Sequence, residues 1–181
     1  MDLKQLRIIH YPDPRLRKPS EPVQKIDAFI ADLTTRMFEL MYEAKGLGLA
    51  AVQAGLNLRL FVTNPIGQPS GEEIYVNPEI LEMRGAVDHE EGCLSLPDVV
   101  APLKRAQWCR IRAFGLDGEP FEQEATDLLA RAWQHEMDHL DGVLICDRMS
   151  PTARIANRRL LKDLERKYEK RRSGSGRIRV P

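Results

Sequence analysis

The sequence predicts an α+β fold in a single domain, with mostly antiparallel sheets packed around a central helix and another helix at the C-terminal end. Three observations support this prediction. The chain has 181 residues, 43% of them hydrophobic, which is enough for one core. Its middle part contains short runs typical of strands. Helical patterns lie before and after these runs.

The elements follow in order along the chain. Apolar residues at helical spacing predict a first helix over residues 27–45. Strand candidates lie at residues 58–63, 73–77, 80–84, 108–114 and 120–125. Asp117 and Gly118 are typical of a hairpin turn, and Asp127 is expected to cap the central helix. A last helix is predicted over residues 151–171, and the Ser-Gly repeat near the end predicts a flexible tail over residues 173–181, after a single domain of residues 1–172.

The central helix carries the motif QHEMDH at residues 134–139. His135 and His139 are one helical turn apart, so both imidazole rings project from the same face and can reach one cation. Glu136 lies beside the first histidine, where its carboxylate can take a proton from a water activated by the metal. The motif therefore predicts a divalent metal, an activated water and a general base.

The third ligand is not evident downstream of the motif. In the longer pattern HExxHxxGxxH the third ligand position is Ile145, which excludes that family. Glu165 is an alternative, but Lys162, Arg166 and Lys167 around it indicate a solvated helix face with ion pairs along the helix.

The three cysteines offer a better third ligand. Cys109 lies in an alternating, strand-like run, and Cys146 follows three apolar residues, so packing explains both. Cys93 lies in a short extended stretch directly after Gly92, and a glycine there permits close approach of a ligand to the backbone. Cys93 is the candidate ligand, with the alternative that it is a buried hydrophobic residue, as isolated cysteines more often are.

A third segment, GLGLAAVQ at residues 46–53, matches the dinucleotide fingerprint GxGxxA only superficially. That fingerprint must follow a strand, whereas this segment follows a helical pattern. Its first glycine is expected to end the helix, and the remainder is expected to be an extended strand. Gln53 is its polar exception, either as a turn residue before Gly55 or as an amide that donates an N–H to an oxyanion.

In this order, the motifs GLGLAAVQ, EGCLS (residues 91–95) and QHEMDH closely resemble those of the peptide deformylase family, in its shorter bacterial form with a helical C-terminus. The start of the chain, at residues 9–17, is also similar to that family. The resemblance implies a hydrolase that removes the formyl group from the N-terminal formyl-methionine of nascent polypeptides and releases formate.

The resemblance also implies a role for individual residues. Cys93, His135 and His139 would bind the metal, Glu136 would be the general acid/base, and Gln53 with the backbone N–H of Leu94 would stabilise the oxyanion. Substrate contacts are expected from residues beside these motifs, with Gly48 in a strand that pairs with the substrate backbone. These residues are Gly46, Leu47, Gly48, Glu91, Leu128 and Ala132.

Selectivity for methionine requires an apolar pocket near the metal. Leu47 adjoins the paired glycines, and Leu128 and Ala132 share a helix face with His135, so we expect them to line this pocket. Packing in the core is the alternative explanation for the two helix residues. At the entrance, Val100 stands where some bacterial members have an arginine. An ion pair between Glu91 and Arg105 is also expected from the spacing and the resemblance.

One divalent metal ion per chain is expected. Two imidazoles and a thiolate suit zinc, iron(II), cobalt or nickel, and the resemblance implies iron(II) in cells. Iron(II) beside a thiolate requires a reducing compartment. The odd number of cysteines and the lack of a signal sequence or of a run of transmembrane length also favour the cytoplasm, with no membrane and no DNA as partners.

The net charge is zero but unevenly distributed. Residues 151–181 contain 11 basic and 3 acidic residues, a balance of +8, which leaves −8 for the rest of the chain. A basic helix is usually only a solvated surface, but an enzyme that meets nascent chains would benefit from contact with ribosomal RNA.

Two other functions are consistent with the motif. A metallopeptidase of another HExxH family would need a third ligand downstream of His139. A zinc module without enzymatic activity would close the site with a fourth ligand from Cys109, Cys146 or Asp147.

Overall fold

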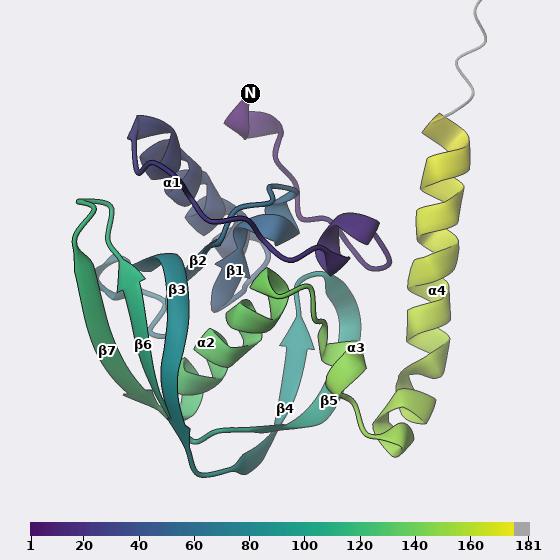
Figure 1. The fold of residues 1–181 in the computed structure, drawn as a ribbon. Coiled ribbons are helices and arrows are strands. Elements are labelled where there is room, and N and C mark those ends of the chain that lie inside the picture. Colours follow the sequence, from purple (N-terminus) through teal and green to yellow (C-terminus); the bar gives the residue numbers. More distant parts are fainter. Residues whose placement is uncertain (176–181) are drawn as a thin grey trace, which may run out of the picture.

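In a computed structural model, which describes residues 1–175, two antiparallel sheets lie on either side of helix α2 (Figure 1). The larger sheet has the strand order β1-β2-β3-β6-β7, and β4 pairs with β5 in the smaller one. The strands are β1 (Gly48–Ala50), β2 (Leu60–Thr63), β3 (Glu73–Arg84), β4 (Val87–Cys93), β5 (Leu96–Arg105), β6 (Trp108–Phe114) and β7 (Pro120–Thr126). The helices are α1 (Ala28–Glu43), α2 (Asp127–Leu140), α3 (Ile145–Arg148) and α4 (Pro151–Ser175). The predicted α+β class is confirmed.

Helix α1 begins where the sequence indicates. The Asp27 side chain accepts hydrogen bonds from the N–H groups of Phe29 and Ile30, which would otherwise have no partner in the first turn. The apolar face of α1 packs on β1 and β2. Lys45 has a φ of 57°, and the Gly46 N–H bonds to a carbonyl of the last turn, so the helix ends just before the first motif.

Strand β1 is shorter than expected. It ends at Ala50, and residues Ala51–Ala54 form a 3₁₀ turn, η3, rather than more strand. The Gln53 side chain folds back and accepts a hydrogen bond from the Ala50 N–H, while Gly55 ends the turn with a φ of 87°. Gln53 is therefore a turn residue whose side chain lies inside the protein.

Strand β3 joins two predicted strands into one. The predicted break, at residues 78–79, follows Asn77, whose φ is 51°, and the pairing with β6 shifts register between Val76 and Glu79. The Asn77 side chain exchanges two hydrogen bonds with the backbone of Val23, which holds the irregular backbone in place. The hairpin between β6 and β7 has Gly118 at a φ of 80°, as its sequence predicted.

The β4–β5 hairpin is the main element that the sequence analysis did not predict, apart from the extended stretch at Cys93. In β5 the buried and exposed side chains alternate. The buried positions include Val99, Ala101 and Leu103, which pack against α3 and α4. Pro97 and Pro102 and a charged end obscure this alternation in the sequence.

Two helix boundaries differ from their predictions. The N-cap of α2 is Thr126 and not Asp127, whose N–H bonds to the Gln107 carbonyl. Helix α4 continues to Ser175. The predicted tail thus begins in a helix at Ser173, and the rest of it lies outside the described residues.

Helix α4 stands at the side of the molecule and packs on β5 (Figure 1). Its buried hydrophobic side chains are Ala153, Leu161 and Leu164. The Tyr11 hydroxyl donates a hydrogen bond of 2.7 Å to Glu165, which ties the N-terminal segment to the helix. No described helix has the length and hydropathy of a membrane span.

Candidate metal centre

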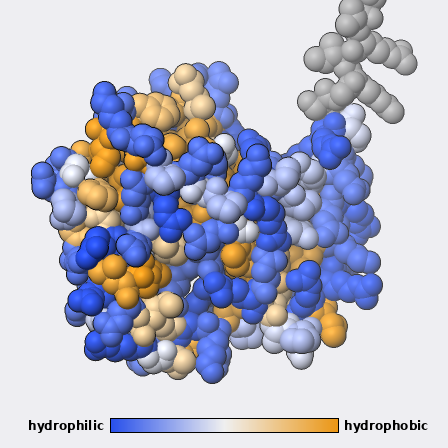
Figure 2. Space-filling view, viewed as in Figure 1, coloured by the Kyte–Doolittle hydropathy of each residue, from blue (hydrophilic) through white to orange (hydrophobic). Residues whose placement is uncertain are grey.

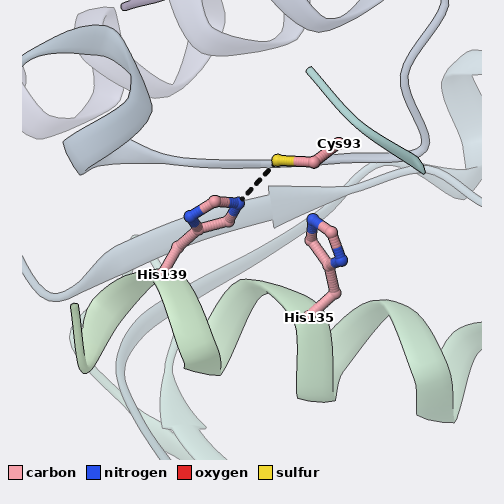
Figure 3. Close-up of side chains that lie close together, drawn as sticks. All are labelled: Cys93, His135 and His139. Atoms are coloured by element: carbon pink, nitrogen blue, oxygen red, sulfur yellow. Dashed lines mark hydrogen bonds between the residues drawn. The ribbon is translucent and has the colours of Figure 1, made fainter. Parts of the chain in front are cut away.

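Cys93, His135 and His139 converge from two elements (Figure 3). Their donor atoms all lie within 4.8 Å of one another, and the Cys93 Sγ lies 3.2 Å from Nε2 of His139. The two histidines project from one face of α2, and Cys93 ends β4 at a shift in register that follows Gly92. Within residues 1–175, no other group of three such side chains is close enough to hold a metal ion.

Glu91 orients one of the histidines. Its Oε2 lies 3.1 Å from Nδ1 of His135, and its two oxygens accept hydrogen bonds of 2.8 and 2.9 Å from Arg105. Burial alone would raise the pKa of Glu91, but the bonds from His135 and Arg105 outweigh it and lower the pKa to about 2. An ionised carboxylate only accepts hydrogen bonds, so Nδ1 of His135 carries the proton and Nε2 remains for a metal. The expected Glu91–Arg105 pair is confirmed.

The same network includes a residue that the sequence analysis missed. Asp138, inside the motif but buried, accepts hydrogen bonds from Arg105 and Arg148. Arg105 thus connects a carboxylate of β4 to a carboxylate of α2. The position of Asp138 between the two histidines of the motif was a signal in the sequence. A carboxylate buried there needs a cationic or hydrogen-bonding partner, which could have revealed this network.

Glu136 is buried, as a carboxyl group with a raised pKa must be. The residue is 3% exposed, and its Oε2 has no hydrogen-bond partner. Burial raises the pKa of Glu136 to about 7. The other oxygen, Oε1, lies only 2.4 Å from where a Cβ on Gly48 would stand, so the glycine is required for this close packing.

The Gln53 amide group points toward the same site. Its Nε2 lies 3.7 Å from the Cys93 Sγ and 3.3 Å from Oγ of Ser95, while its oxygen is held by the Ala50 N–H. This fixed oxygen determines that the NH₂ side of the amide faces the cysteine. Both earlier interpretations of Gln53, a turn residue and an amide directed at the site, are therefore compatible.

A cleft of about 630 Å³ opens beside the three converging side chains. Every residue expected at the site lines it except His139, which is buried. Leu47 and Leu128 are 43% and 39% exposed, so neither is a core residue. Val100 lies at the exposed rim. The sequence analysis missed several lining residues, including Ile8, His10, Lys45 and Arg131, which carry no motif and reach the cleft only through the fold.

The other proposed ligands are engaged elsewhere. The Cys109 thiol contacts the Ala130 carbonyl, and burial raises its pKa to about 11. Cys146 and Asp147 lie next to Arg17. Glu165 accepts its hydrogen bond from Tyr11. One thiolate and two imidazoles at this spacing fit a single divalent cation with room for a further ligand from the cleft.

Three side chains that could hold a metal ion at a cleft, with a buried carboxylate beside them, are typical of a metal-dependent hydrolase rather than of a closed structural metal site. The comparisons with known proteins give the family. A sequence profile described as polypeptide deformylase matches residues 5–154. The chain belongs to the peptide deformylase family, the metal-dependent enzymes that remove the N-terminal formyl group from nascent peptides.

Individual relatives agree with this assignment. The chain is 45% identical over 164 residues to a peptide deformylase of Acidobacterium capsulatum, covering 90% of this chain and 96% of that protein. A crystal structure of a peptide deformylase from Legionella pneumophila is 41% identical, with a TM-score of 0.84 and coverage of 91% and 98%. The peptide deformylase 1B of Arabidopsis thaliana, in complex with an inhibitor, gives 41% identity, a TM-score of 0.88 and coverage of 92% and 93%.

Proposed function

We propose that this chain deformylates formyl-methionine peptides with Cys93, His135 and His139 as the ligands of one catalytic cation and Glu136 as the general acid/base. The observation that carries the proposal is the convergence of three donor atoms within 4.8 Å, with a buried carboxylate of the same helix beside them. Glu91 acts through His135 as a positioning residue, since both its oxygens are already bonded to Arg105 and the imidazole.

The reaction is the hydrolysis of an amide. A bound divalent cation would supply Lewis acidity, which polarises the formyl carbonyl and lowers the pKa of a water to roughly 7. Glu136 accepts the proton of the attacking water at Oε2, the oxygen that has no partner. The water oxygen bonds to the formyl carbon, the carbon–nitrogen bond breaks, and Glu136 passes its proton to the nitrogen of the leaving amine. The products are formate and a free N-terminus.

Negative charge develops on the formyl oxygen during this attack. The Gln53 NH₂ group, whose orientation is fixed by the bond from Ala50 to its oxygen, donates to this oxygen together with the backbone N–H of Leu94. One such preorganised donor contributes about 3–4 kcal/mol to the stability of a transition state. Because Gln53 needs no rotation to donate, little reorganisation is required when the charge appears.

The substrate backbone pairs with the segment Gly46, Leu47 and Gly48. Among residues 1–175, strand β1 pairs only with β2, so one side of it is an open sheet edge along the cleft. An extended peptide can add to such an edge as a further strand. Glu136 packs directly against Gly48, which brings a paired peptide close to the carboxylate.

The methionine side chain occupies the part of the cleft lined by Leu47, Leu128 and Ala132. The two leucines have large exposed fractions, which favours a contact surface over core packing. Their flexible apolar side chains suit a long, unbranched ligand. Val100 at the opposite rim leaves that part of the entrance without a positive charge.

Iron(II) is the proposed native metal, with zinc, nickel or cobalt as substitutes, because one thiolate and two imidazoles accept all of them. The three cysteines of the chain are free. We place the enzyme in the reducing cytoplasm, where a thiolate-bound iron is protected from oxidation. The basic helix α4 is proposed to contact ribosomal RNA, which would bring the enzyme to its nascent substrates.

The assignment is tested by the variant Glu136→Gln, with Glu90→Gln as a control that changes a carboxylate of the same cleft. Both proteins are purified anaerobically with iron(II), and formate release from a formyl-Met peptide is measured with the metal content. Glu136→Gln should keep its metal and lose activity by about 100- to 10,000-fold, while Glu90→Gln keeps both. Native turnover in Glu136→Gln would refute the assigned role.

A further inference from the structure

The two proposed oxyanion donors belong to different elements. Gln53 lies in the turn η3, and Leu94 lies in the turn between β4 and β5. Preorganised donors are effective only if they stay fixed relative to the same oxygen. The Gln53 side chain must therefore be held against the turn that carries Leu94.

Ser95 makes the contact between these two elements. It directly follows Leu94, and its Oγ accepts a hydrogen bond of 3.3 Å from Nε2 of Gln53. Cys93 pairs with Leu96, so Leu94 and Ser95 are the two residues of a tight hairpin turn. In a turn this short, the backbone N–H of Leu94 and the side chain of Ser95 cannot move independently.

The hydrogen bond to Ser95 completes the constraints on the Gln53 amide. A primary amide has one oxygen and two N–H hydrogens. The Ala50 N–H bonds to the oxygen at 2.8 Å and the Ser95 hydroxyl accepts from one N–H, which leaves the second N–H for the site, where Nε2 lies 3.7 Å from the Cys93 Sγ. The terminal torsion of a glutamine side chain is otherwise broad, so the bond at the nitrogen fixes the plane of the amide.

Ser95 acts from outside the cleft. The residue is fully buried and, unlike its two neighbours in the chain, does not line the cleft, so a peptide bound there does not contact it. Backbone bonds hold the same region independently of the hydroxyl. The Ile9 N–H donates to the Gln53 carbonyl at 2.8 Å, and the Tyr11 N–H donates to the Ser95 carbonyl at 2.9 Å. Loss of the hydroxyl should thus disturb the amide and leave the turn in place.

We propose that Ser95 is a positioning residue that directs the Gln53 amide toward the formyl oxygen and keeps it in register with the N–H of Leu94. The inference rests on the proposed function, in which Gln53 and Leu94 stabilise the oxyanion. It adds the residue through which the two donors act on one oxygen. Because the charge on that oxygen develops only in the transition state, the bond should affect kcat and leave KM unchanged.

The test compares two serine variants. Ser95→Ala removes the acceptor of the Gln53 amide. Ser20→Ala removes a hydroxyl that is also buried but, within residues 1–175, has no hydrogen-bond partner and does not line the cleft. Formate release from a formyl-Met peptide gives kcat and KM, and the metal content and melting temperature are measured in parallel.

The two variants should differ in kcat alone. Ser95→Ala should lower kcat by about 3- to 10-fold, the shift that the loss of one neutral hydrogen bond produces, and should keep the native KM and metal content. Ser20→Ala should keep the native kcat as well. Native kcat in Ser95→Ala, or equal losses in the two serine variants, would overturn the proposal.

A double-mutant cycle shows whether Ser95 acts through Gln53. Gln53→Leu removes the donor itself and should lower kcat by about 100- to 1,000-fold. Adding Ser95→Ala to Gln53→Leu should then cost nothing further, because the amide that Ser95 holds is gone. Full turnover in Gln53→Leu would refute the oxyanion role of Gln53 in the proposed function, and the inference with it. Slow turnover in Gln53→Leu, with an independent multiplicative loss from Ser95→Ala, would refute only the inference about Ser95.

The Gln53 amide also reports directly on the hydrogen bond. Its two side-chain N–H signals are recorded by NMR in the isotope-labelled, zinc-loaded enzyme and are identified by their absence from Gln53→Leu. Ser95→Ala should shift these signals and speed their exchange with water, while Ser20→Ala leaves them unchanged. Unchanged Gln53 signals in Ser95→Ala would also overturn the proposal. If Ser95→Ala melts at a lower temperature, the spectra are recorded below its transition, where the Gln53 signals still decide the question.

Discussion

Replacement of Gly48 by alanine tests the geometry of the acid/base group without touching its chemistry. The added Cβ would lie 2.4 Å from Oε1 and 3.0 Å from the carboxyl carbon of Glu136. An ordinary contact begins at 3.4 Å, so the carboxylate must withdraw by about 1 Å. The Glu136 residue is only 3% exposed, which leaves it little space in which to adapt.

The size of the effect follows from this displacement. A misplacement of about 1 Å in an active site can reduce the rate by about 100-fold. Complete loss of an acid/base group costs on the order of 100- to 10,000-fold. We therefore expect Gly48→Ala to lower kcat by at least about 100-fold while the three ligand side chains keep the metal.

The control is Gly92→Ala, in the strand that carries Cys93. A Cβ there would meet its neighbours at 3.8 and 3.9 Å, which is ordinary contact. Both variants are assayed by formate release from a formyl-Met peptide, with metal analysis and a melting curve. Native kcat in Gly48→Ala, or an equal loss in Gly92→Ala, would refute the argument that Gly48 positions the carboxylate.

Three further predictions concern the ligand, the pocket and the ion network. Cys93→Ser replaces a soft thiolate with a weak hydroxyl ligand, so metal content and turnover should both fall; unchanged values in both measurements would exclude the cysteine as a ligand. Ala132→Phe should fill the methionine pocket and raise KM far more for formyl-Met than for formyl-Ala peptides, whereas equal losses with a lower melting temperature would place Ala132 in the core. Arg105→Leu should lower the free energy of unfolding in urea by about 3–5 kcal/mol, because the buried Glu91 carboxylate loses its arginine and Asp138 keeps only Arg148 as its cationic partner. The control, Arg112→Leu, breaks only an exposed pair with Glu122 and should cost about 0–1 kcal/mol, and equal losses in these two would contradict the reasoning.

The parts of the fold that could be predicted are those with local signals. Helix α1 has both a cap at Asp27 and a regular apolar face, and the β6–β7 hairpin has Asp117 and Gly118 at its turn. The irregular parts have no local signal. The bulge in β3 is held by two hydrogen bonds between the Asn77 side chain and the backbone of Val23, which is 54 positions away. No periodic pattern in the sequence indicates these hydrogen bonds.

The residues of the site also divide into those with a local signal in the sequence and those without one. The histidines and Glu136 could be placed relative to one another because a single helix fixes their spacing. Cys93 was identified by elimination and by resemblance, since the partner of a strand residue depends on the tertiary fold. Asp138 was missed because its function, accepting bonds from Arg105 and Arg148, arises only when β5 and the segment after α2 come together.

The positions of the proposed metal ligands depend most on the β4–β5 hairpin, which has no clear signal in the sequence. Cys93 reaches the histidines only if β4 is held against α2, and the main polar link between these elements is Arg105, whose side chain is 3% exposed. Arg105 bonds to Glu91 of β4 and to Asp138 of α2, and Glu91 bonds in turn to His135. A buried network of this kind contributes little net stability, because removing the charges from water offsets their attraction. Its role here is positional, since it fixes one strand and one histidine ring relative to each other, and a catalytic cation requires both at once.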